Sequence, residues 1–329
     1  MLRIGVIGSG GIISKHITHL AGRKDAGIVA LCDVDPKRIQ ATNDAYFKDK
    51  PVKGYATPKA MYAKAKLDAV IIATPHTLHY THGAQGIKAG CHVFLEKPMT
   101  TSSKDARKLA KQAEEANKII AIGYNTACSR AFRYLRQLIR AEKMGKLEMV
   151  TGFLSQNWLK ITTGLWRQDP KLSGGGQAYD SGAHILNSLL WSVGSEPETV
   201  FALLDNKGCA VDINTVMSIR FANGVLANIT VSGNCASDGS HMVFIFENGL
   251  VEIDGWGGGW IKIKAKDVDS EIPADIEEFF PIINFVEAIQ GKAEVAANAK
   301  NGINHSLLMD CIYASAKSGK PILASKLKG

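Results

Sequence analysis

Asp180 and His184 lie four positions apart and follow three consecutive glycines in the segment GGGQAYDSGAHILN, residues 174–187. If residues 177–191 form a helix, the two side chains lie one turn apart on the same face. A carboxylate in that position can accept a hydrogen bond from the imidazole, which orients the ring and raises its basicity. The pair could then move a proton at neutral pH, although an exposed helical pair without a catalytic role has the same spacing. The three glycines would let the chain pass close to a bound ligand before the helix begins.

Lys97 is the second candidate for chemistry, in the segment LEKPMT at residues 95–100. It ends a short apolar run, and the carboxyl ends of strands face the ligand crevice in open α/β sheets. The proline that follows biases Lys97 toward an extended conformation. Its ammonium group would then project into the crevice, although a lysine at a strand end is also commonly an ordinary solvated residue.

The segment VIGSGGIISKH, residues 6–16, places Gly8 and Gly10 directly after the first apolar run. Glycine at 8 allows a tight turn, and glycine at 10 lets the backbone approach a pyrophosphate at a helix N-terminus. Ile13 stands where Gly or Ala would allow the closest helix packing. Asp33 ends the next apolar run, where an acid would accept hydrogen bonds from the adenosine ribose. The order of strand, turn, helix, strand and acid predicts a dinucleotide site.

Asp33 also bears on the choice between NAD and NADP. A carboxylate about 4 Å from a 2′-phosphate would cost about 4 kcal/mol at an effective dielectric constant of about 20. Lys37 and Arg38 lie nearby in the sequence, where they either serve a phosphate or face water. The sequence therefore favours NAD over NADP.

The pattern of apolar and polar residues changes near residue 145. Before it, short apolar runs alternate with helical stretches, which is typical of a parallel sheet covered on both faces. After it, longer alternating strands appear, with hairpin signals at Asn223-Gly224 and Asn248-Gly249. We therefore expect an α/β protein, with a doubly wound parallel Rossmann sheet followed by an α/β domain that has an open, mainly antiparallel sheet. The expected domains are residues 1–123 for NAD(P) binding and residues 124–329 for substrate binding and oligomerisation.

Composition narrows the function classes. The chain has 329 residues and a formal charge of +8 that is spread thinly, without the basic and aromatic clusters typical of nucleic-acid binding. No apolar run approaches the roughly 20 residues needed to cross a bilayer. The six cysteines show no paired or metal-ligand spacing, which indicates free thiols in a reducing compartment. We expect a cytoplasmic enzyme with no metal, no nucleic-acid partner and no membrane association.

In combination these motifs resemble the glucose–fructose oxidoreductase / inositol dehydrogenase (Gfo/Idh/MocA) family of NAD(P)-dependent oxidoreductases. The resemblance spans nearly the whole chain. It rests on GSGGI (8–12), ATPHTLH (73–79), AGCHVFLEKP (89–98), GYN (123–125), LWRQDPKLSGGGQAYDSGAHILN (165–187), NFVEAIQGK and YASAKSGKPI.

The resemblance implies hydride transfer between a nicotinamide and a secondary alcohol of a sugar, sugar acid or cyclitol. It implies that Lys97 contacts the reacting hydroxyl and the cofactor, that His184 exchanges the proton, and that Asp180 orients or relays. It also implies a homodimer or homotetramer, often with the open sheet buried between subunits. The residues expected to bind the cofactor are Gly8, Gly10, Gly11, Ile12, Asp33, Thr74, Pro75, His76, His79, Glu96, Lys97, Asn125 and Arg167. Those expected to bind the substrate are Lys97, Asn125, Trp166, Asp180 and His184.

Three departures from the family pattern bear on substrate identity. Ile13 loosens the glycine fingerprint, His76 stands where the family usually has asparagine, and Asn187 replaces an acid common three residues after the histidine. In addition, TACSRAF at 126–132 does not match the usual Arg-Phe pair.

Two alternative functions stay open at this point. In the first, a bound NAD supports glycoside cleavage through transient oxidation, elimination and re-reduction, with His76 and His241 as further acid–base candidates. In the second, the protein is a non-catalytic NAD(H)-sensing regulator, which has no need of Lys97, Asp180 and His184 as a proton-transfer set. Trp256, in the segment WGGGW, either marks a hairpin tip or caps the substrate of a neighbouring subunit.

Overall fold

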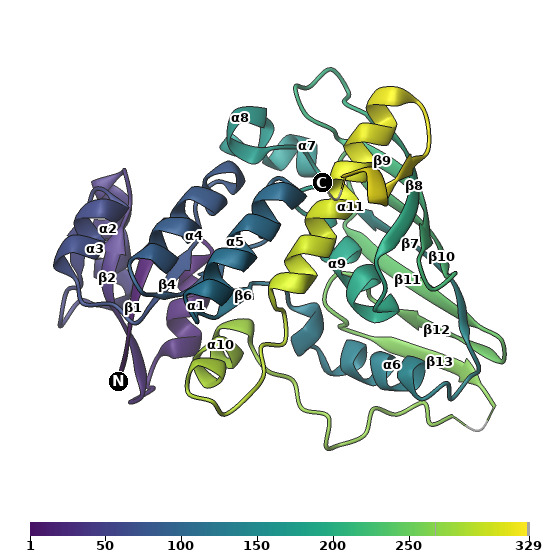
Figure 1. The fold of residues 1–329 in the computed structure, drawn as a ribbon, viewed down its shortest axis with the longest axis horizontal. Coiled ribbons are helices and arrows are strands. Elements are labelled where there is room, and N and C mark those ends of the chain that lie inside the picture. Colours follow the sequence, from purple (N-terminus) through teal and green to yellow (C-terminus); the bar gives the residue numbers. More distant parts are fainter. Residues whose placement is uncertain (267, 328–329) are drawn as a thin grey trace. The chain divides into compact units, whose positions relative to one another are not determined.

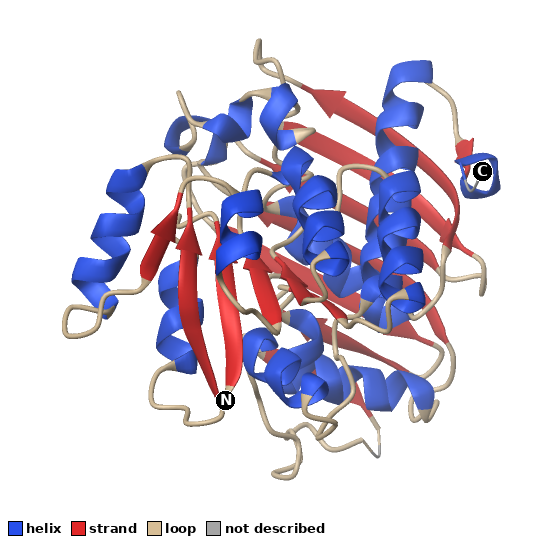
Figure 2. Cartoon of the chain, turned by 60° about the vertical axis from the view of Figure 1, so that its left-hand side comes forward, coloured by secondary structure: helices blue, strands red, loops and turns tan. Residues whose placement is uncertain are grey.

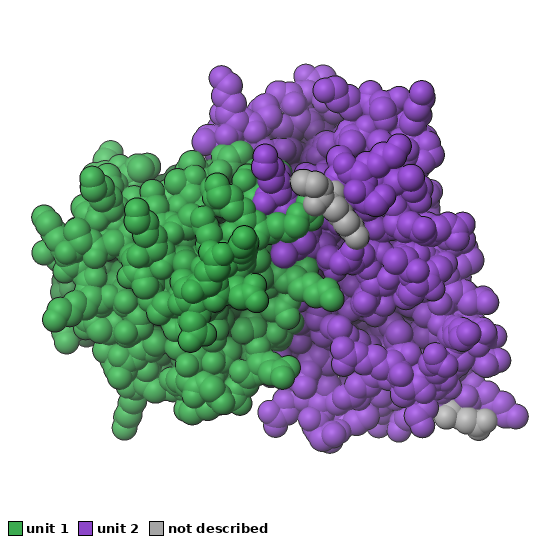
Figure 3. All heavy atoms as spheres, viewed as in Figure 1, with its two compact units in different colours: residues 1–101, 105–123, 280–300 green, residues 102–104, 124–279, 301–329 purple. Residues whose placement is uncertain are grey.

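The computed structural model describes residues 1–266 and 268–327. The chain divides into two compact units, coloured separately in Figure 3. The first contains Met1–Thr101, Asp105–Gly123 and Phe280–Lys300, and the second contains Ser102–Lys104, Tyr124–Phe279 and Asn301–Gly329. The functional division expected between residues 123 and 124 stays a prediction. The chain contacts also place residues 280–300 in the first unit, although most of the second unit precedes them in the sequence.

The first unit is built on a six-stranded parallel sheet with the strand order β3-β2-β1-β4-β5-β6. This order is that of a doubly wound Rossmann sheet, as the sequence predicts. Figure 2 shows these strands as parallel arrows. Their bounds are β1 (Leu2–Ile7), β2 (Ala26–Cys32), β3 (Lys53–Tyr55), β4 (Ala69–Ile72), β5 (His92–Leu95) and β6 (Ile120–Ile122).

Helices form two layers on this sheet, because alternate residues of a strand face opposite sides. Ile4 and Val6 of β1 belong to an apolar cluster with residues of α1 and α10, whereas a side chain at Gly5 would meet Met61 of α3. Phe285 of α10 is fully buried in that cluster, which is why residues 280–300 pack with the first unit. The helices are α1 (Ile13–Leu20), α2 (Pro36–Tyr46), α3 (Pro58–Lys64), η1 (His76–Leu78), α4 (His79–Lys88), α5 (Ser103–Glu115) and α10 (Pro281–Ile289).

The second unit contains an eight-stranded sheet with the order β13-β12-β11-β7-β10-β9-β8-β14. Neighbouring strands are antiparallel except for β10 and β7, so the expected open, mainly antiparallel sheet is confirmed. Both Asn-Gly pairs lie at the turns of hairpins, β9–β10 and β11–β12. The bounds are β7 (Leu147–Ser155), β8 (Pro197–Asp205), β9 (Asn214–Phe221), β10 (Leu226–Ser232), β11 (Gly239–Phe246), β12 (Gly249–Ile253), β13 (Ile261–Ala265) and β14 (Ile322–Leu323).

The helix α9 is the core helix of the second unit and packs against α6 and β7 (Figure 1). Of its twelve described residues, all but His184 are buried. Among the residues that the structure describes, no helix has the length and apolar character that a membrane crossing requires. The helices of this unit are η2 (Thr126–Cys128), α6 (Arg130–Arg140), α7 (Trp158–Ile161), η3 (Trp166–Gln168), α8 (Pro170–Ser173), α9 (Gly182–Val193), α11 (Ala299–Ser318) and η4 (Ala324–Leu327).

Candidate active site

In the first unit, the predicted cofactor residues follow strand ends that are level with one another. Ile7, at the end of β1, pairs with Cys32 of β2 and Ile72 of β4, and Ile72 pairs with Leu95 of β5. This common edge is the carboxyl edge of the sheet, where open α/β folds bind their ligands. The predicted residues that follow it are Gly8, Gly10, Gly11, Ile12, Asp33, Thr74, Pro75, His76, His79, Glu96 and Lys97.

The glycine turn after β1 has the shape needed to receive a phosphate. Gly8 has φ of +91°, and a side chain there would lie 2.6 Å from the carbonyl oxygen of Ala73. At Gly10 and Gly11, by contrast, an added Cβ would meet no described atom within 4 Å. The helix α1 begins at Ile13 with no side-chain cap bond and no acid in its first turn. Its N-terminal N–H groups therefore suit a pyrophosphate, and the residues present fit a dinucleotide.

Asp33 fastens this turn to the end of β2. It is only 8% exposed, and its carboxylate accepts the N–H of Ser9 at 2.7 Å and the N–H of Asp35 at 2.9 Å. An ionised carboxylate has about four acceptor positions, so two backbone bonds leave capacity for ribose hydroxyls. The carboxylate of Asp33 can therefore hold the glycine turn and also accept hydrogen bonds from a ribose.

His79 braces the loops that follow β4 and β5. The side chain is fully buried, with Nδ1 2.7 Å from the carbonyl oxygen of Pro98 and Nε2 2.9 Å from that of Thr74. Burial lowers the pKa of His79 and outweighs the opposing effects of the two carbonyl contacts and of Glu96. Its expected contact with the cofactor stays a prediction, and the observed bonds give it a role in fixing Thr74 and Pro98.

Glu96 is paired with a residue that the sequence reading missed. His16 of α1 places Nε2 2.6 Å from Oε1 of Glu96, and both side chains are largely buried. Burial by itself raises the pKa of Glu96, but the hydrogen bond and charge of His16, with smaller effects of Lys97 and His79, bring the pKa below its usual value. The signal in the sequence was a histidine on the apolar face of α1, between Ile13 and Ile17. The partly exposed Lys97 thus follows a carboxylate that is ionised and held in place.

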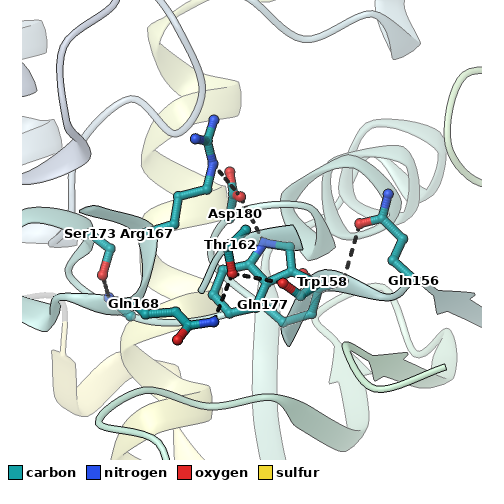
Figure 4. Close-up of polar contacts among 9 residues, drawn as sticks. Gln156, Trp158, Thr162, Arg167, Gln168, Ser173, Gln177 and Asp180 are labelled. Carbon is teal, nitrogen blue, oxygen red and sulfur yellow. Dashed lines mark hydrogen bonds and ion pairs between the residues drawn. The ribbon is translucent and has the colours of Figure 1, made fainter. Parts of the chain in front are cut away.

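In the second unit, Asp180 is a buried carboxylate with two strong donors on one oxygen (Figure 4). Its Oδ2 accepts Nε1–H of Trp158 and Nε–H of Arg167, each at 2.9 Å. Asp180 is 6% exposed and Trp158 is 1% exposed. The guanidinium of Arg167 also lies over the ring of Trp166, 4.7 Å from its centroid. Three predicted residues, Trp166, Arg167 and Asp180, are therefore brought together, and Trp158 joins them.

The helix that carries His184 begins later than the sequence suggested. It runs over Gly182–Val193, not from residue 177. Before it, the N–H groups of Tyr179 and Asp180 donate to the carbonyl oxygen of Gly176, and Gly182 N–H donates to that of Gln177. Because these bonds form a tight turn, Asp180 precedes the helix. The predicted hydrogen bond between Asp180 and His184 stays a prediction.

Asp212 anchors the turn, and the sequence reading did not single it out. This side chain is 3% exposed. It accepts the N–H of Gly176 at 2.7 Å, the N–H of Ala178 at 2.9 Å and the hydroxyl of Tyr313 at 2.6 Å. Its position in the loop between β8 and β9 gave no local signal of this role. Asp212 therefore determines where the segment leading to Asp180 lies.

Backbone conformation and close packing, not a need for flexibility, require glycine at positions 174–176. Gly174 ends α8 with φ of +76°, a conformation that favours glycine. A side chain at Gly175 would overlap the hydroxyl of Tyr313, and one at Gly176 would overlap the backbone of Asp212. The close neighbour that the sequence indicated is thus protein, in place of the bound ligand that we expected.

Four other predicted positions have clear places. Asn187 is 1% exposed and donates to Thr126 Oγ1 at 3.0 Å, so it belongs to a buried network. Asn125 is exposed just before η2, and His76 is 4% exposed. His241 pairs with Glu252 at 3.3 Å on the sheet. Within the described residues, no group of three or more His, Cys, Asp or Glu could hold a metal ion.

A parallel sheet of this order, with an open glycine turn and an acid after β2, defines an NAD-binding Rossmann domain. The chain belongs to the Gfo/Idh/MocA family. Residues 2–124 match the family described as "Oxidoreductase family, NAD-binding Rossmann fold", and residues 132–252 match the "GFO/IDH/MocA C-terminal domain". It is therefore an NAD-binding oxidoreductase of a family that acts on sugars and cyclitols.

Similar proteins cover almost the full length of the chain. An inositol 2-dehydrogenase of Rhizobium meliloti (strain 1021) is 26% identical over 98% of this chain and 98% of its own. A D-glucoside 3-dehydrogenase of Escherichia coli (strain K12) is 22% identical over 97% and 96%. Among solved structures, the WlbA dehydrogenase of Bordetella pertussis, in complex with NADH and UDP-GlcNAcA, has a TM-score of 0.87 at 24% identity and covers 98% of each chain. That likeness shows the shared fold.

Asp212→Ala should destabilise the second unit strongly. The substitution leaves two backbone N–H groups and one buried hydroxyl without their acceptor, and each such loss costs about 1–3 kcal/mol. We expect a loss of about 3 kcal/mol or more in the free energy of unfolding, measured by urea denaturation. Tyr313→Phe, which removes one donor, should cost about a third as much. The control Asp205→Ala alters an exposed acid paired with Lys207 and should change little; equal losses at both aspartates would contradict the anchoring role.

His82 should make stability depend on pH. Burial, with a smaller effect of His79, lowers the pKa of His82 from 6.5 to about 4. The unfolded chain therefore takes up this proton first, so the contribution is complete above pH 6.5 and is lost as the pH falls toward 4. Since the side chain is partly exposed, we expect about 1 kcal/mol less stability at pH 5 than at pH 7 from this residue. Urea denaturation of His82→Gln at both pH values should show a smaller pH dependence than the wild type; an unchanged pH dependence would refute the assignment.

Proposed function

We propose that the protein catalyses reversible hydride transfer between NAD and a secondary alcohol of a sugar, sugar acid or cyclitol. The observation that carries the proposal is the membership of both parts of the chain in the Gfo/Idh/MocA family. It is supported by the chemistry of three side chains: Lys97 beside an ionised glutamate, Asp180 as a held carboxylate, and His184 as the one described residue of α9 that is not buried.

NAD supplies the hydride acceptor at its nicotinamide C4. In the oxidation direction we assign the hydroxyl proton of the substrate to a ring nitrogen of His184. Lys97 donates a hydrogen bond to the same oxygen and stabilises the negative charge that develops there. Asp180 orients the imidazole and favours its protonated form. The alcohol carbon loses a hydride, its oxygen loses a proton, and a ketone results.

We assign the cofactor as NAD in preference to NADP. Asp33 is 8% exposed and is fixed by two backbone N–H groups, so it cannot swing away from a 2′-phosphate. Repulsion at about 4 Å would cost about 4 kcal/mol at an effective dielectric constant of about 20. Lys37 and Arg38 lie on α2, which follows Asp33, and offer only partial compensation.

A plain dehydrogenase fits the remaining histidines better than glycoside cleavage does. His76 is 4% exposed, and the ring of His241 contacts Phe153 and Trp260 in addition to Glu252. Both therefore have structural surroundings, which argues against either of them as a further acid–base group for cleavage. The names of the similar dehydrogenases, which act on a glucoside and on inositol, support a cyclic polyol as the substrate.

We propose that the protein forms a homodimer or homotetramer through the outer face of the eight-stranded sheet. Phe153, Val216 and Leu203 are 45%, 45% and 57% exposed. Strand register places them in one row with Thr230, since Thr230 pairs with both Phe153 and Val216, and Val216 pairs with Leu203. Met149, at 48%, adds to the same face. A contiguous exposed apolar surface of this kind is typical of a protein–protein interface. A cytoplasmic location stays an expectation.

Lys97→Met and His184→Asn should each lower kcat by about 10² to 10⁴-fold. The assay follows the absorbance of reduced nicotinamide with NAD, then NADP, across sugars, sugar acids and inositols. Affinity for NAD, measured by calorimetry, should stay within a few-fold for His184→Asn, because this substitution leaves the glycine turn intact. Lys64→Met, on the exposed end of α3, is the matched control for Lys97→Met. Full turnover in either site variant would overturn the assignment of that residue.

Phe153→Arg combined with Leu203→Arg should weaken self-association at least about a hundredfold, about 3 kcal/mol. Charges buried without partners in an apolar interface are costly. Sedimentation velocity over a range of concentrations measures this effect. Tyr46→Arg, an exposed aromatic on α2, should leave the oligomer intact. A wild type that sediments as a monomer would disprove the proposed interface.

A further inference from the structure

Trp256 stacks flat on the imidazole of His184. The two ring centroids are 4.3 Å apart and the ring planes differ by 21°. Trp256 comes from the loop that follows β12, and His184 comes from α9. The contact therefore joins two elements that are distant in the sequence and that meet in the second unit.

The loop that carries Trp256 is held by one carboxylate. Asp254 accepts the N–H groups of Trp256 at 3.1 Å, Gly257 at 3.2 Å and Gly259 at 3.0 Å. Its own N–H donates to the carbonyl oxygen of Trp260 at 3.0 Å. These bonds close the loop on itself, so the indole is carried by a fixed backbone.

The loop is also seated against its neighbours. An added Cβ at Gly255 would lie 2.8 Å from Cγ of Met242 and 3.2 Å from Cδ1 of Ile185, the residue next to His184. Gly258 has φ of +73°, and its added Cβ would lie 3.1 Å from Phe132 of α6. Two glycines of this loop, Gly255 just before WGGGW and Gly258 within it, are thus required for close packing, which places the indole at a defined distance from α9.

A flat stack fixes a ring without using its nitrogen atoms. Hydrogen bonds of an imidazole lie in the plane of the ring at its edge, whereas the indole contacts its face. Aromatic side chains bury much apolar surface at small cost in conformational entropy, and stacked pairs gain further energy from their geometry. The π face of an indole also attracts a ring that has gained a proton.

We propose that Trp256 is a positioning residue for His184, and this inference rests on the proposed function. The indole holds the imidazole plane so that a ring nitrogen points at the hydroxyl whose proton it exchanges. One face of the indole is covered by His184, so Trp256 acts through the histidine in place of capping the sugar. Asp254 supports this arrangement by holding the loop.

The test uses Trp256→Leu and Trp256→Phe in the full-length protein. We expect Trp256→Leu to lower kcat about 10 to 100-fold, a part of the about 10² to 10⁴-fold contribution of a positioned acid–base group, with KM within about twofold of the wild type. Trp256→Phe keeps an aromatic face and should recover much of the lost kcat. Trp260→Leu, in the same loop, is the matched control and should keep the wild-type kcat. Thermal unfolding of each variant checks that the fold is retained.

A second measurement reports the stack without any turnover. In proton NMR, the ring protons of His184, assigned by comparison with His184→Asn, should lie upfield in the wild type because of the indole ring current. They should move downfield in Trp256→Leu and remain upfield in Trp260→Leu. Unmoved resonances in Trp256→Leu would overturn the stack itself.

The kinetic outcomes separate the inference from the function on which it rests. A raised KM with unchanged kcat in Trp256→Leu would make Trp256 a substrate contact and overturn the positioning role. An unchanged kcat and KM would overturn it as well. Full turnover by His184→Asn would overturn the proposed role of His184 itself, and the positioning role with it. A parallel loss of kcat, partial recovery by phenylalanine and a downfield shift together would support the proposal.

Discussion

The need to satisfy buried carboxylates organises the loops of this protein. A carboxylate removed from water is costly unless it is paired or hydrogen-bonded. The buried Asp33 and Asp212 accept backbone N–H groups, and so does the partly exposed Asp254. Asp33 holds the glycine turn, Asp212 holds the segment before Asp180, and Asp254 holds the loop of Trp256. Each aspartate lies beside the end of a strand, so its hydrogen bonds fix an irregular segment relative to a sheet. Side chains on loops gain fixed positions in this way, which chemistry at a site requires.

Glycine allows the backbone to approach its neighbours closely enough for such hydrogen bonds to form. For an N–H group to reach a buried acid, the backbone must come closer than a side chain would permit. Gly176 lies against the backbone of Asp212, and Gly255 lies against Met242 and Ile185. At Gly10 and Gly11, by contrast, an added Cβ would meet no described atom within 4 Å. Runs of glycine that look alike in the sequence therefore serve two purposes, contact within the protein and access for a ligand.

Local patterns predicted the elements of the fold well. Five of the six parallel strands, all except the short β3, and both Asn-Gly hairpins follow from hydrophobic periodicity and turn chemistry, which act over a few residues. The pairings that complete the site join residues far apart in the chain, and no local pattern encodes them. His16 with Glu96, Asp212 with Gly176, and Trp256 with His184 are examples. The start of α9 was also misplaced, because the turn that precedes it is set by the carbonyl oxygens of Gly176 and Gln177 and not by helix propensity.

The surroundings of three histidines give each of them a different role. His79 has both ring nitrogens on carbonyl oxygens and is fully buried, so it braces two loops and has no route for a proton. His16 uses Nε2 on Glu96 and so keeps that glutamate ionised. At His184, the contact with Trp256 uses the face of the ring, and His184 is the one described residue of α9 that is not buried. An imidazole that is held by its face can bind and release protons at its ring nitrogens and keep its orientation. A repeated acid–base step requires this.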